Sequence, residues 1–403
     1  MRRRDFIALA ATAALAKQEK LPQVRAITRG PNFHWFGYYD KLQFDPSNRY
    51  VLTMRTGFEH RSPRPDDLIQ LGLIDLQDSD KWMDLGETTA WCWQQGCMLQ
   101  WLPGSASEVI WNDREHGQYI SRILDVKTGQ RRSLPGPIYA LSPDGRQAVT
   151  TDFRRLADAR PGYGYNGIPD PNKDMLAPDD SGIWRMDLRS GECKLIFSIR
   201  DAVRIPCVRH DWRGAKHWFN HLLYAPDGKR IVFLHRWTGG AAGSRRLTRM
   251  FTLSPEGLEP HVVDDFGGMS HFIWRDASHI LGWAERPPAG KAFYLFEDRT
   301  RGVEVVGAGV MTEDGHCTYL PDNRWILCDT YPDAQRVQHP YLFHITTNTR
   351  HPLGHFFSSP EYRGEWRCDT HPRISRDGHL VSIDSPHAGG RQIYLLDIRT
   401  IIG

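Results

Sequence analysis

Apolar residues recur along this chain in a two-part pattern. A run of alternating apolar residues leads into a turn of the type Pro-Asp-Gly, and a second apolar run follows the turn. A period of two residues on both sides of a tight turn predicts two antiparallel strands. A further strand that ends in aspartate comes after such hairpins, as in residues 72–76 and 184–188. The pattern predicts repeated units of antiparallel sheet.

Seven copies of this unit follow one another along the chain. Their turns lie at residues 45–48, 103–104, 143–145, 226–228, 276–278, 321–323 and 376–378. Repeated four-stranded units of this kind form the blades of a β-propeller, so the predicted fold is an all-β, seven-bladed β-propeller. The last unit lacks an outer strand, and residues 24–28 are expected to supply it. An N-terminal strand would thus close the ring and leave no open sheet edge.

One segment interrupts the repeat between the third and fourth units. Residues 154–216 are rich in Pro, Gly, Asp and Tyr, and we expect them to form a long loop insertion that overhangs the central funnel. Long loops on a rigid scaffold are commonly functional or mobile. The sequence leaves open whether this one forms a substrate wall or a passive addition.

Composition and charge are those of a globular protein. Of 403 residues, 40% are hydrophobic and 25% charged, and the net charge of +3 comes from scattered arginines. The absence of a basic run argues against a nucleic-acid partner, while a small acidic ligand remains compatible. The seven cysteines are an odd number, so at least one is free. Cys92 and Cys97 could pair, but buried thiols are the favoured interpretation.

The N-terminus predicts export. Arg2, Arg3 and Arg4 precede an apolar stretch at residues 7–16, which is typical of a twin-arginine signal peptide covering residues 1–16. The stretch is too short to span a bilayer, so no stable membrane insertion is expected. We expect a periplasmic or secreted protein whose propeller occupies residues 22–403.

Histidines gather at one position of the repeat. The residue just before the innermost strand of each blade should face the funnel, and in chain order this residue is Lys41, Met98, Ile138, His221, His271, His316 and His371. Four neighbouring blades therefore present histidine. Such residues can simply bridge blades by hydrogen bonds. Clustered imidazoles on one channel also form a metal site, and Asp369, two residues before His371, adds an oxygen ligand on the same face.

The clustered histidines and Asp369 are therefore candidate metal ligands. Their mixed nitrogen and oxygen set favours Mn²⁺, with Zn²⁺ or Ca²⁺ as alternatives. Tyr39 and Lys41 lie at the entrance of the first blade, and Tyr39 is a further candidate for substrate contact.

Several motifs in this order resemble the oligogalacturonate lyases, metal-dependent seven-bladed propellers related in architecture to ulvan lyases. They are Trp218-Phe-Asn-His221, Phe233-Leu-His235, Arg249-Met250, Ser270-His271, His316 and Thr370-His371-Pro372. The resemblance covers the first blade and residues 218–398. It implies that His316 and His371 bind the metal and that Arg249 and His271 act on the substrate. The chain departs from the family pattern at Asp369, where the family has histidine, and at Trp366 or Arg367, where it has a glutamine ligand.

The hypothesis is therefore a polysaccharide lyase that cleaves an oligo- or polysaccharide containing uronic acid by metal-assisted β-elimination. His271 is the candidate base, because imidazole titrates near neutral pH, and Arg249 is the candidate carboxylate clamp. The resemblance leaves open that Arg249 takes the proton instead. His221 and Tyr39 are candidates for substrate contact or protonation of the leaving group. The alternative is a non-catalytic periplasmic propeller that binds or scaffolds. A propeller hydrolase is disfavoured, because the sequence contains no Gly-x-Ser-x-Gly motif.

Overall fold

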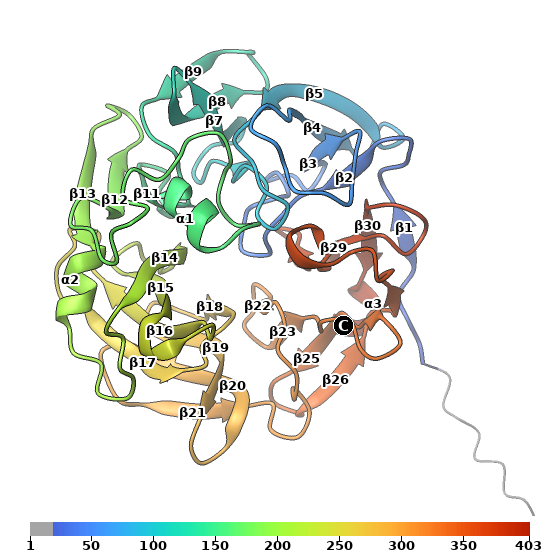
Figure 1. Ribbon diagram of the computed structural model, residues 1–403. Coiled ribbons are helices and arrows are strands. Elements are labelled where there is room, and N and C mark those ends of the chain that lie inside the picture. Colours follow the sequence, from blue (N-terminus) through green and yellow to red (C-terminus); the bar gives the residue numbers. More distant parts are fainter. Residues whose placement is uncertain (1–18) are drawn as a thin grey trace, which may run out of the picture.

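Seven antiparallel sheets stand around a common axis like the blades of a propeller (Figure 1). The structure is a computed structural model, and it describes residues 19–403. Each blade has four strands, which confirms the predicted seven-bladed all-β fold. The predicted signal peptide, residues 1–16, lies outside the described residues.

The blades follow one another in chain order. The first three are β2 (Phe33–Trp35), β3 (Tyr50–Thr56), β4 (Ile69–Asp75) and β5 (Lys81–Thr88); β6 (Gln100–Trp101), β7 (Glu108–Glu115), β8 (Gln118–Asp125) and β9 (Arg131–Leu134); and β10 (Ala140–Leu141), β11 (Gln147–Thr151), β12 (Gly182–Asp187) and β13 (Cys193–Ser198). The fourth and fifth are β14 (Ala215–Tyr224), β15 (Ile231–Gly239), β16 (Leu247–Leu253) and β17 (His261–Gly267), then β18 (Phe272–Trp274), β19 (His279–Arg286), β20 (Gly290–Glu297) and β21 (Val303–Val306). The sixth is β22 (Thr318–Tyr319), β23 (Trp325–Cys328), β25 (Tyr341–His344) and β26 (Thr349–Pro352).

The seventh blade closes the ring with strands from both ends of the described chain. It contains β28 (Arg373–Ile374), β29 (Leu380–Ser385), β30 (Gln392–Asp397) and β1 (Val24–Ala26). β1 pairs antiparallel with β30, and the amide of Ile27 donates to the carbonyl of Ile393 at 3.0 Å. The predicted N-terminal closing strand is confirmed, and it covers the edge of β30.

The predicted insertion is wrong as a single loop. Residues 154–216 contain β12 and β13, so the outer half of the third blade lies inside this range. Two parts of this range are not strands of a blade. The first runs from the end of α1 (Phe153–Ala159) to β12, and the second runs from α2 (Ile199–Arg204) to β14. β12 covers most of the aspartate-ended run at residues 184–188 that the sequence pattern already marks as a strand, so the predicted bounds of the loop were too wide.

Apolar layers between neighbouring blades form the core. One cluster joins Leu281 and Phe293 of the fifth blade to Ile326 and Phe343 of the sixth. Similar clusters lie between the other blades, so each sheet buries both faces. All seven cysteines are free thiols.

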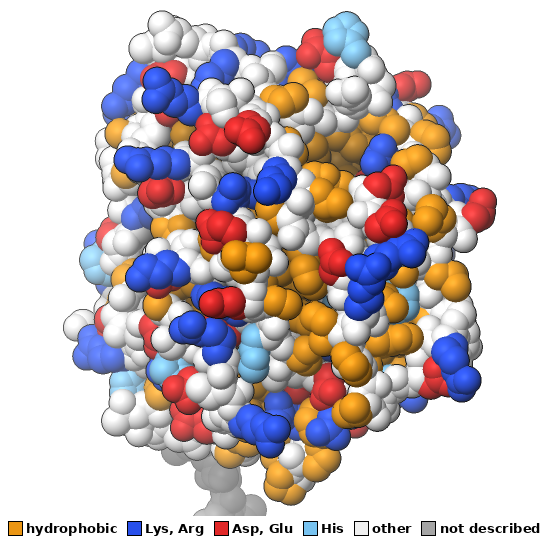
Figure 2. Space-filling model, turned by 90° about the vertical axis from the view of Figure 1, so that its left-hand side faces the viewer, with side chains coloured by type: hydrophobic (Ala, Val, Ile, Leu, Met, Phe, Trp, Pro, Cys, Tyr) orange, Lys and Arg blue, Asp and Glu red, His pale blue; other side chains and the backbone are white. Residues whose placement is uncertain are grey.

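Helices are few and short. α3 (Arg399–Ile402), η1 (Gly240–Ala242) and η2 (Gly364–Trp366) complete the set, and β24 (Val337–Gln338) pairs with β27 (Phe356–Phe357) outside the blades. Among residues 19–403 no helix is long and apolar enough to cross a membrane. On the side shown in Figure 2, basic and acidic side chains are interspersed, without a continuous basic patch on that face.

Candidate active site

Four histidines sit where the chain enters the inner strands of four consecutive blades. His271 directly precedes β18, His316 and His371 come two residues before β22 and β28, and His221 lies at a register shift in β14. The ring centroids of His271 and His316 are 4.3 Å apart, and those of His316 and His371 are 4.2 Å apart. Three of the four predicted imidazoles thus form one contiguous group, and all four are buried.

The chain adopts a left-handed backbone conformation at two of these histidines. The φ angle is 55° at His221 and 39° at His371, and Met98, at the same position of the repeat, has 59°. Non-glycine residues are disfavoured there, so the surrounding packing must hold them in place. The repeat therefore places these side chains by a sharp turn of the backbone before the inner strand.

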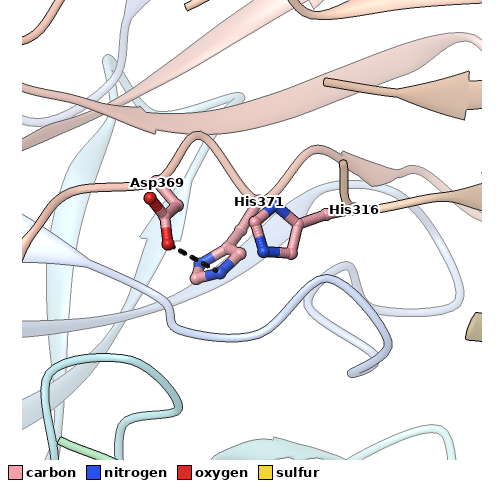
Figure 3. A group of neighbouring side chains, drawn as sticks. All are labelled: His316, Asp369 and His371. Atoms are coloured by element: carbon pink, nitrogen blue, oxygen red, sulfur yellow. Dashed lines mark ion pairs between the residues drawn. The ribbon is translucent and has the colours of Figure 1, made fainter. Parts of the chain in front are cut away.

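His316, Asp369 and His371 form a candidate metal centre (Figure 3). One ligand atom from each residue can be chosen so that all lie within 4.8 Å of one another. The Nε2 atoms of both histidines are buried without a hydrogen-bond partner, and Nε2 of His371 is 3.9 Å from an oxygen of Asp369. Two unpartnered imidazole nitrogens beside a carboxylate fit a divalent cation, because a buried polar atom without a partner is otherwise costly.

Buried carboxylates orient two of the imidazoles. Nδ1 of His316 is 3.0 and 3.1 Å from the carboxylate oxygens of Asp329, which also accepts from the His316 amide at 2.7 Å. Nδ1 of His271 is 2.9 Å from Asp314. Each ring donates a hydrogen bond from Nδ1–H to its carboxylate, so the lone pair of the ring lies on Nε2.

Burial and charge set the protonation of these rings in opposite directions. Burial lowers the pKa of His271 despite the nearby charge of Asp314, and burial together with neighbouring positive groups lowers the pKa of His371 well below its usual value. Burial alone would also lower the pKa of His316, but the charge of Asp329 outweighs it and raises that pKa. His271 is therefore neutral at pH 7 and able to accept a proton.

Tyrosines pack over the histidines. Tyr38 stacks on His221 at a centroid distance of 4.9 Å and meets His371 edge-on at 5.1 Å. The hydroxyl of Tyr39 donates to the carbonyl of Phe272 at 2.8 Å and accepts from its amide at 3.1 Å. Tyr39 thus fixes the strand that follows His271, and its hydroxyl is fully engaged by backbone. Its predicted role in contacting substrate does not fit this arrangement.

His221 is held in the same layer. Nε2 of His221 is 3.4 Å from the hydroxyl of Tyr38, and Nδ1 is 3.3 Å from the side-chain nitrogen of Gln95. Burial and the charge of Arg236 lower the pKa of His221 well below its ordinary value. His221 is a neutral member of the site, beside the cluster of the other three imidazoles.

Arg249 lies on the face of its blade that carries His235, away from the histidine cluster. The prediction that it contacts the substrate does not fit this position. Its guanidinium donates to Nδ1 of His235 at 3.0 Å, to the carbonyl of Ile205 at 3.0 Å, and to the carbonyl of Ala202. Arg249 is fully buried and stands on β16, the third strand of its blade. It anchors the segment before β14, and its guanidinium is directed at these protein acceptors.

Three residues at the site were assigned no role from the sequence. Tyr163, from the segment after α1, meets His221 edge-on at 5.7 Å. Arg367 donates to Asp369 and to the hydroxyl of Tyr163, both at 2.7 Å. Arg236, next to His235 on β15, carries a positive charge that helps to lower the pKa of His221 in the same blade. The tyrosine-rich composition of residues 161–165 was the available signal for Tyr163.

The tyrosine hydroxyl between these arginines is unusually acidic. Burial alone would raise the pKa of Tyr163, but the charges of Arg367 and Arg160 outweigh it and lower the pKa to about 8. The guanidinium of Arg160 lies 4.3 Å from the centre of the Tyr163 ring. The long segment therefore brings Tyr163 into contact with His221 and Arg367, and its role as a substrate wall stays a prediction.

Comparisons with known proteins identify the fold. No family model and no curated protein matches the sequence. An oligogalacturonate lyase structure from Vibrio parahaemolyticus superposes with a TM-score of 0.67 at 13% identity, covering 94% of this chain and 95% of that chain. A structure of oligogalacturonate lyase in complex with manganese gives 0.67 at 17% identity and 93% of each chain. The chain shares the fold of oligogalacturonate lyases.

A propeller of similar architecture also occurs in a protein that is named as a protease. The β-propeller domain of the Trilobed protease from Pyrococcus furiosus gives a TM-score of 0.53 at 10% identity, covering 92% of this chain and 95% of that chain. At these identities the likeness establishes the fold alone. The resemblance read from the motifs is thus confirmed for the fold, and function must be argued from the side chains.

Proposed function

We propose that this chain is a polysaccharide lyase that cleaves a uronate-containing oligo- or polysaccharide by β-elimination. The observation that carries the proposal is the group of His271, His316 and His371, with Asp369, in a fold shared with oligogalacturonate lyases. Solvent reaches the neighbourhood of His271. The hydroxyl of Tyr331 lies 3.5 Å from Nε2 of His271, and Tyr331 is 36% exposed. A sugar would approach from this side.

His316, His371 and Asp369 would hold a divalent cation. Their nitrogen and oxygen donors suit Mn²⁺, and Zn²⁺ or Ca²⁺ remain alternatives. When bound, the cation supplies positive charge that stabilises a uronate carboxylate as the C5 proton is lost. Arg367, next to Trp366, donates to Asp369 and so holds the carboxylate of Asp369 in place.

His271 is the proposed base. Nδ1–H of His271 donates a hydrogen bond to Asp314, so the lone pair of Nε2 can receive the proton from C5 of the uronate. The electrons of the C5–H bond then form the C4–C5 double bond, and the C4–O bond breaks with its electrons on the leaving oxygen. The products are an unsaturated sugar and a shortened chain.

The leaving oxygen requires a proton. Tyr163 is the proposed donor, because its hydroxyl is held by Arg367 beside the cluster and is more acidic than an ordinary tyrosine. Donation leaves a phenolate that two arginines stabilise, and exchange with water restores the hydroxyl. His221 and Tyr38 form the wall of the site below this group.

A direct assay tests the proposal. Purified protein with Mn²⁺ is incubated with pectic, alginate, ulvan and glycosaminoglycan fragments, and the ultraviolet absorbance of an unsaturated product is followed. We expect product from at least one uronate substrate, its loss in His316→Ala and His271→Ala, and its retention in His379→Ala. His379 is an exposed histidine in the same blade as His371 and serves as the control. Binding without product on every substrate would favour the non-catalytic alternative.

Export is part of the proposal. The twin-arginine character of residues 1–16 supports action in the periplasm or outside the cell, where polysaccharide fragments are met. Fractionation of cells that express the full chain tests this, with a double Arg→Lys change at Arg3 and Arg4 expected to retain the protein in the cytoplasm.

A further inference from the structure

Two histidines outside the funnel face each other across the short ribbon of β24 and β27. The register of this ribbon pairs Gln338 with Phe356. The next residues outward, His339 after β24 and His355 before β27, therefore stand opposite each other. Their Nδ1 atoms are 2.7 Å apart, and their ring centroids are 5.0 Å apart. Because directly opposite residues of an antiparallel pair have neighbouring side chains, the backbone itself brings these rings together.

A carboxylate binds the outer nitrogen of each ring. Nε2 of His339 is 3.1 Å from an oxygen of Asp333, and Nε2 of His355 is 2.8 Å from an oxygen of Glu19. An ionised carboxylate only accepts hydrogen bonds, so Nε2 carries the proton in both rings. A neutral imidazole has a single N–H, and each Nδ1 atom therefore presents a lone pair to the other. Two lone pairs 2.7 Å apart repel each other unless a cation lies between them.

The arrangement of the two rings is that of imidazoles in a metal site. Such a ring directs one nitrogen at the ion and donates its other N–H to a carboxylate, which fixes the tautomer. In a tetrahedral zinc site with Zn–N bonds of about 2.0–2.1 Å, two ligand nitrogens stand about 3.3 Å apart, so the Nδ1 atoms would separate by about 0.6 Å. This is a small rotation for the side chains of His339 and His355, which are 25% and 42% exposed.

We infer that His339 and His355 form a second metal site, which binds a transition-metal ion such as Zn²⁺ through the two Nδ1 atoms and leaves the remaining positions to water. Imidazole ligands suit Zn²⁺ or Cu²⁺, whereas Mn²⁺ and Ca²⁺ prefer oxygen ligands. The inference does not rest on the proposed function, because neither ring belongs to the histidine cluster of the candidate active site.

An ion at this site would connect three segments of the chain. The ribbon supplies the two ligands, and Glu19 belongs to the N-terminal segment beyond the predicted signal peptide, so an exported chain retains it. The amide of His339 also donates to the hydroxyl of Thr330 at 3.1 Å. Thr330 lies between Asp329, which orients His316, and Tyr331. Bound metal would therefore fasten the ribbon beside the chain that enters the candidate active site.

Zinc stoichiometry tests the inference without turnover. The full-length chain and its variants are freed of metal with EDTA, desalted and titrated with Zn²⁺ in competition with a fluorescent chelator at neutral pH. We expect His339→Asn and His355→Asn each to bind one Zn²⁺ fewer than wild type. The matched control is His379→Ala, an exposed histidine whose ring likewise contacts an aspartate, and it should bind as much Zn²⁺ as wild type. The same titration with Mn²⁺ should not distinguish His339→Asn from wild type.

Asp333→Asn tests the orientation of the ring while both ligands stay in place. The amide oxygen of asparagine can still accept from the amides of Gln335 and Val337, but the amide nitrogen cannot accept from Nε2 of His339. We expect the affinity of this site for Zn²⁺ to fall about tenfold. Equal zinc stoichiometry in wild type, His339→Asn and His355→Asn would overturn the inference and assign the contact to a proton shared by the two rings. Loss of an equivalent of Mn²⁺ in His339→Asn would overturn the choice of metal.

Discussion

Replacing Asp329 by asparagine is expected to weaken metal binding without removing any metal ligand. Asp329 is 1% exposed, and its oxygens accept from Nδ1 and the amide of His316 and from the hydroxyl of Thr370. The carboxylate thereby fixes the tautomer that leaves Nε2 of His316 free. Asparagine has nearly the same shape, so the blade should remain folded, but it offers one acceptor oxygen and no charge.

The size of the effect follows from this geometry. Loss of the partner that orients a metal-binding imidazole typically costs about 10- to 100-fold in metal affinity, or about 1.4–2.8 kcal/mol. Asp329 makes two contacts near 3 Å with one ring, which supports a value toward the upper end. The removal of a buried negative charge next to a cation acts in the same direction.

Competition with a fluorescent chelator measures the dissociation constant for Mn²⁺. The matched control is Asp314→Asn, which changes the equivalent carboxylate on His271, a ring that is proposed as base and not as ligand. We expect Asp329→Asn to weaken metal binding and Asp314→Asn to leave it unchanged while reducing turnover. Equal metal affinity in wild type and Asp329→Asn, or an equal loss in both variants, would refute the reasoning.

Further predictions concern the proton of Tyr163, the structural role of Arg249 and the closure of the ring by β1. Because the native pKa of Tyr163 is about 8, raising the pH through this value should remove its proton, and the resulting tyrosinate absorbance should be missing from Tyr163→Phe. Arg249→Ala should lower the free energy of unfolding by about 3 kcal/mol in urea titrations, because buried carbonyls lose their donor; turnover lost at unchanged stability would contradict its structural role. Ile27→Ala, beside the closing strand, should lower the free energy of unfolding by about 2 kcal/mol, and an unchanged urea midpoint would argue against ring closure by β1.

The repeat made the architecture predictable. Alternating apolar runs around seven turns specify four-stranded units, and the missing outer strand of the last unit pointed to residues 24–28. The repeat register also brought His271, His316 and His371 to one end of the blades, since equivalent positions in a closed ring face the same axis. Asp369 followed from the two-residue period of extended chain.

Only the tertiary structure decided which arginines face the site. His235 and Arg236 are neighbours on β15 and point to opposite faces, and a one-residue difference in register exchanges the two sides. Arg249 follows His235 to the far face, whereas Arg236 stays near His221. Sequence spacing cannot show which face of an interior strand meets the funnel.

The remaining members of the site come from distant parts of the chain. Tyr163 and Arg367 meet across 204 positions, and Asp329 and Thr370 across 41. No local periodicity records such contacts, because they depend on how irregular segments cross the closed ring. The sequence by itself therefore determined the propeller and its row of histidines, while the fold decided the charges and hydrogen bonds that give those histidines their chemistry.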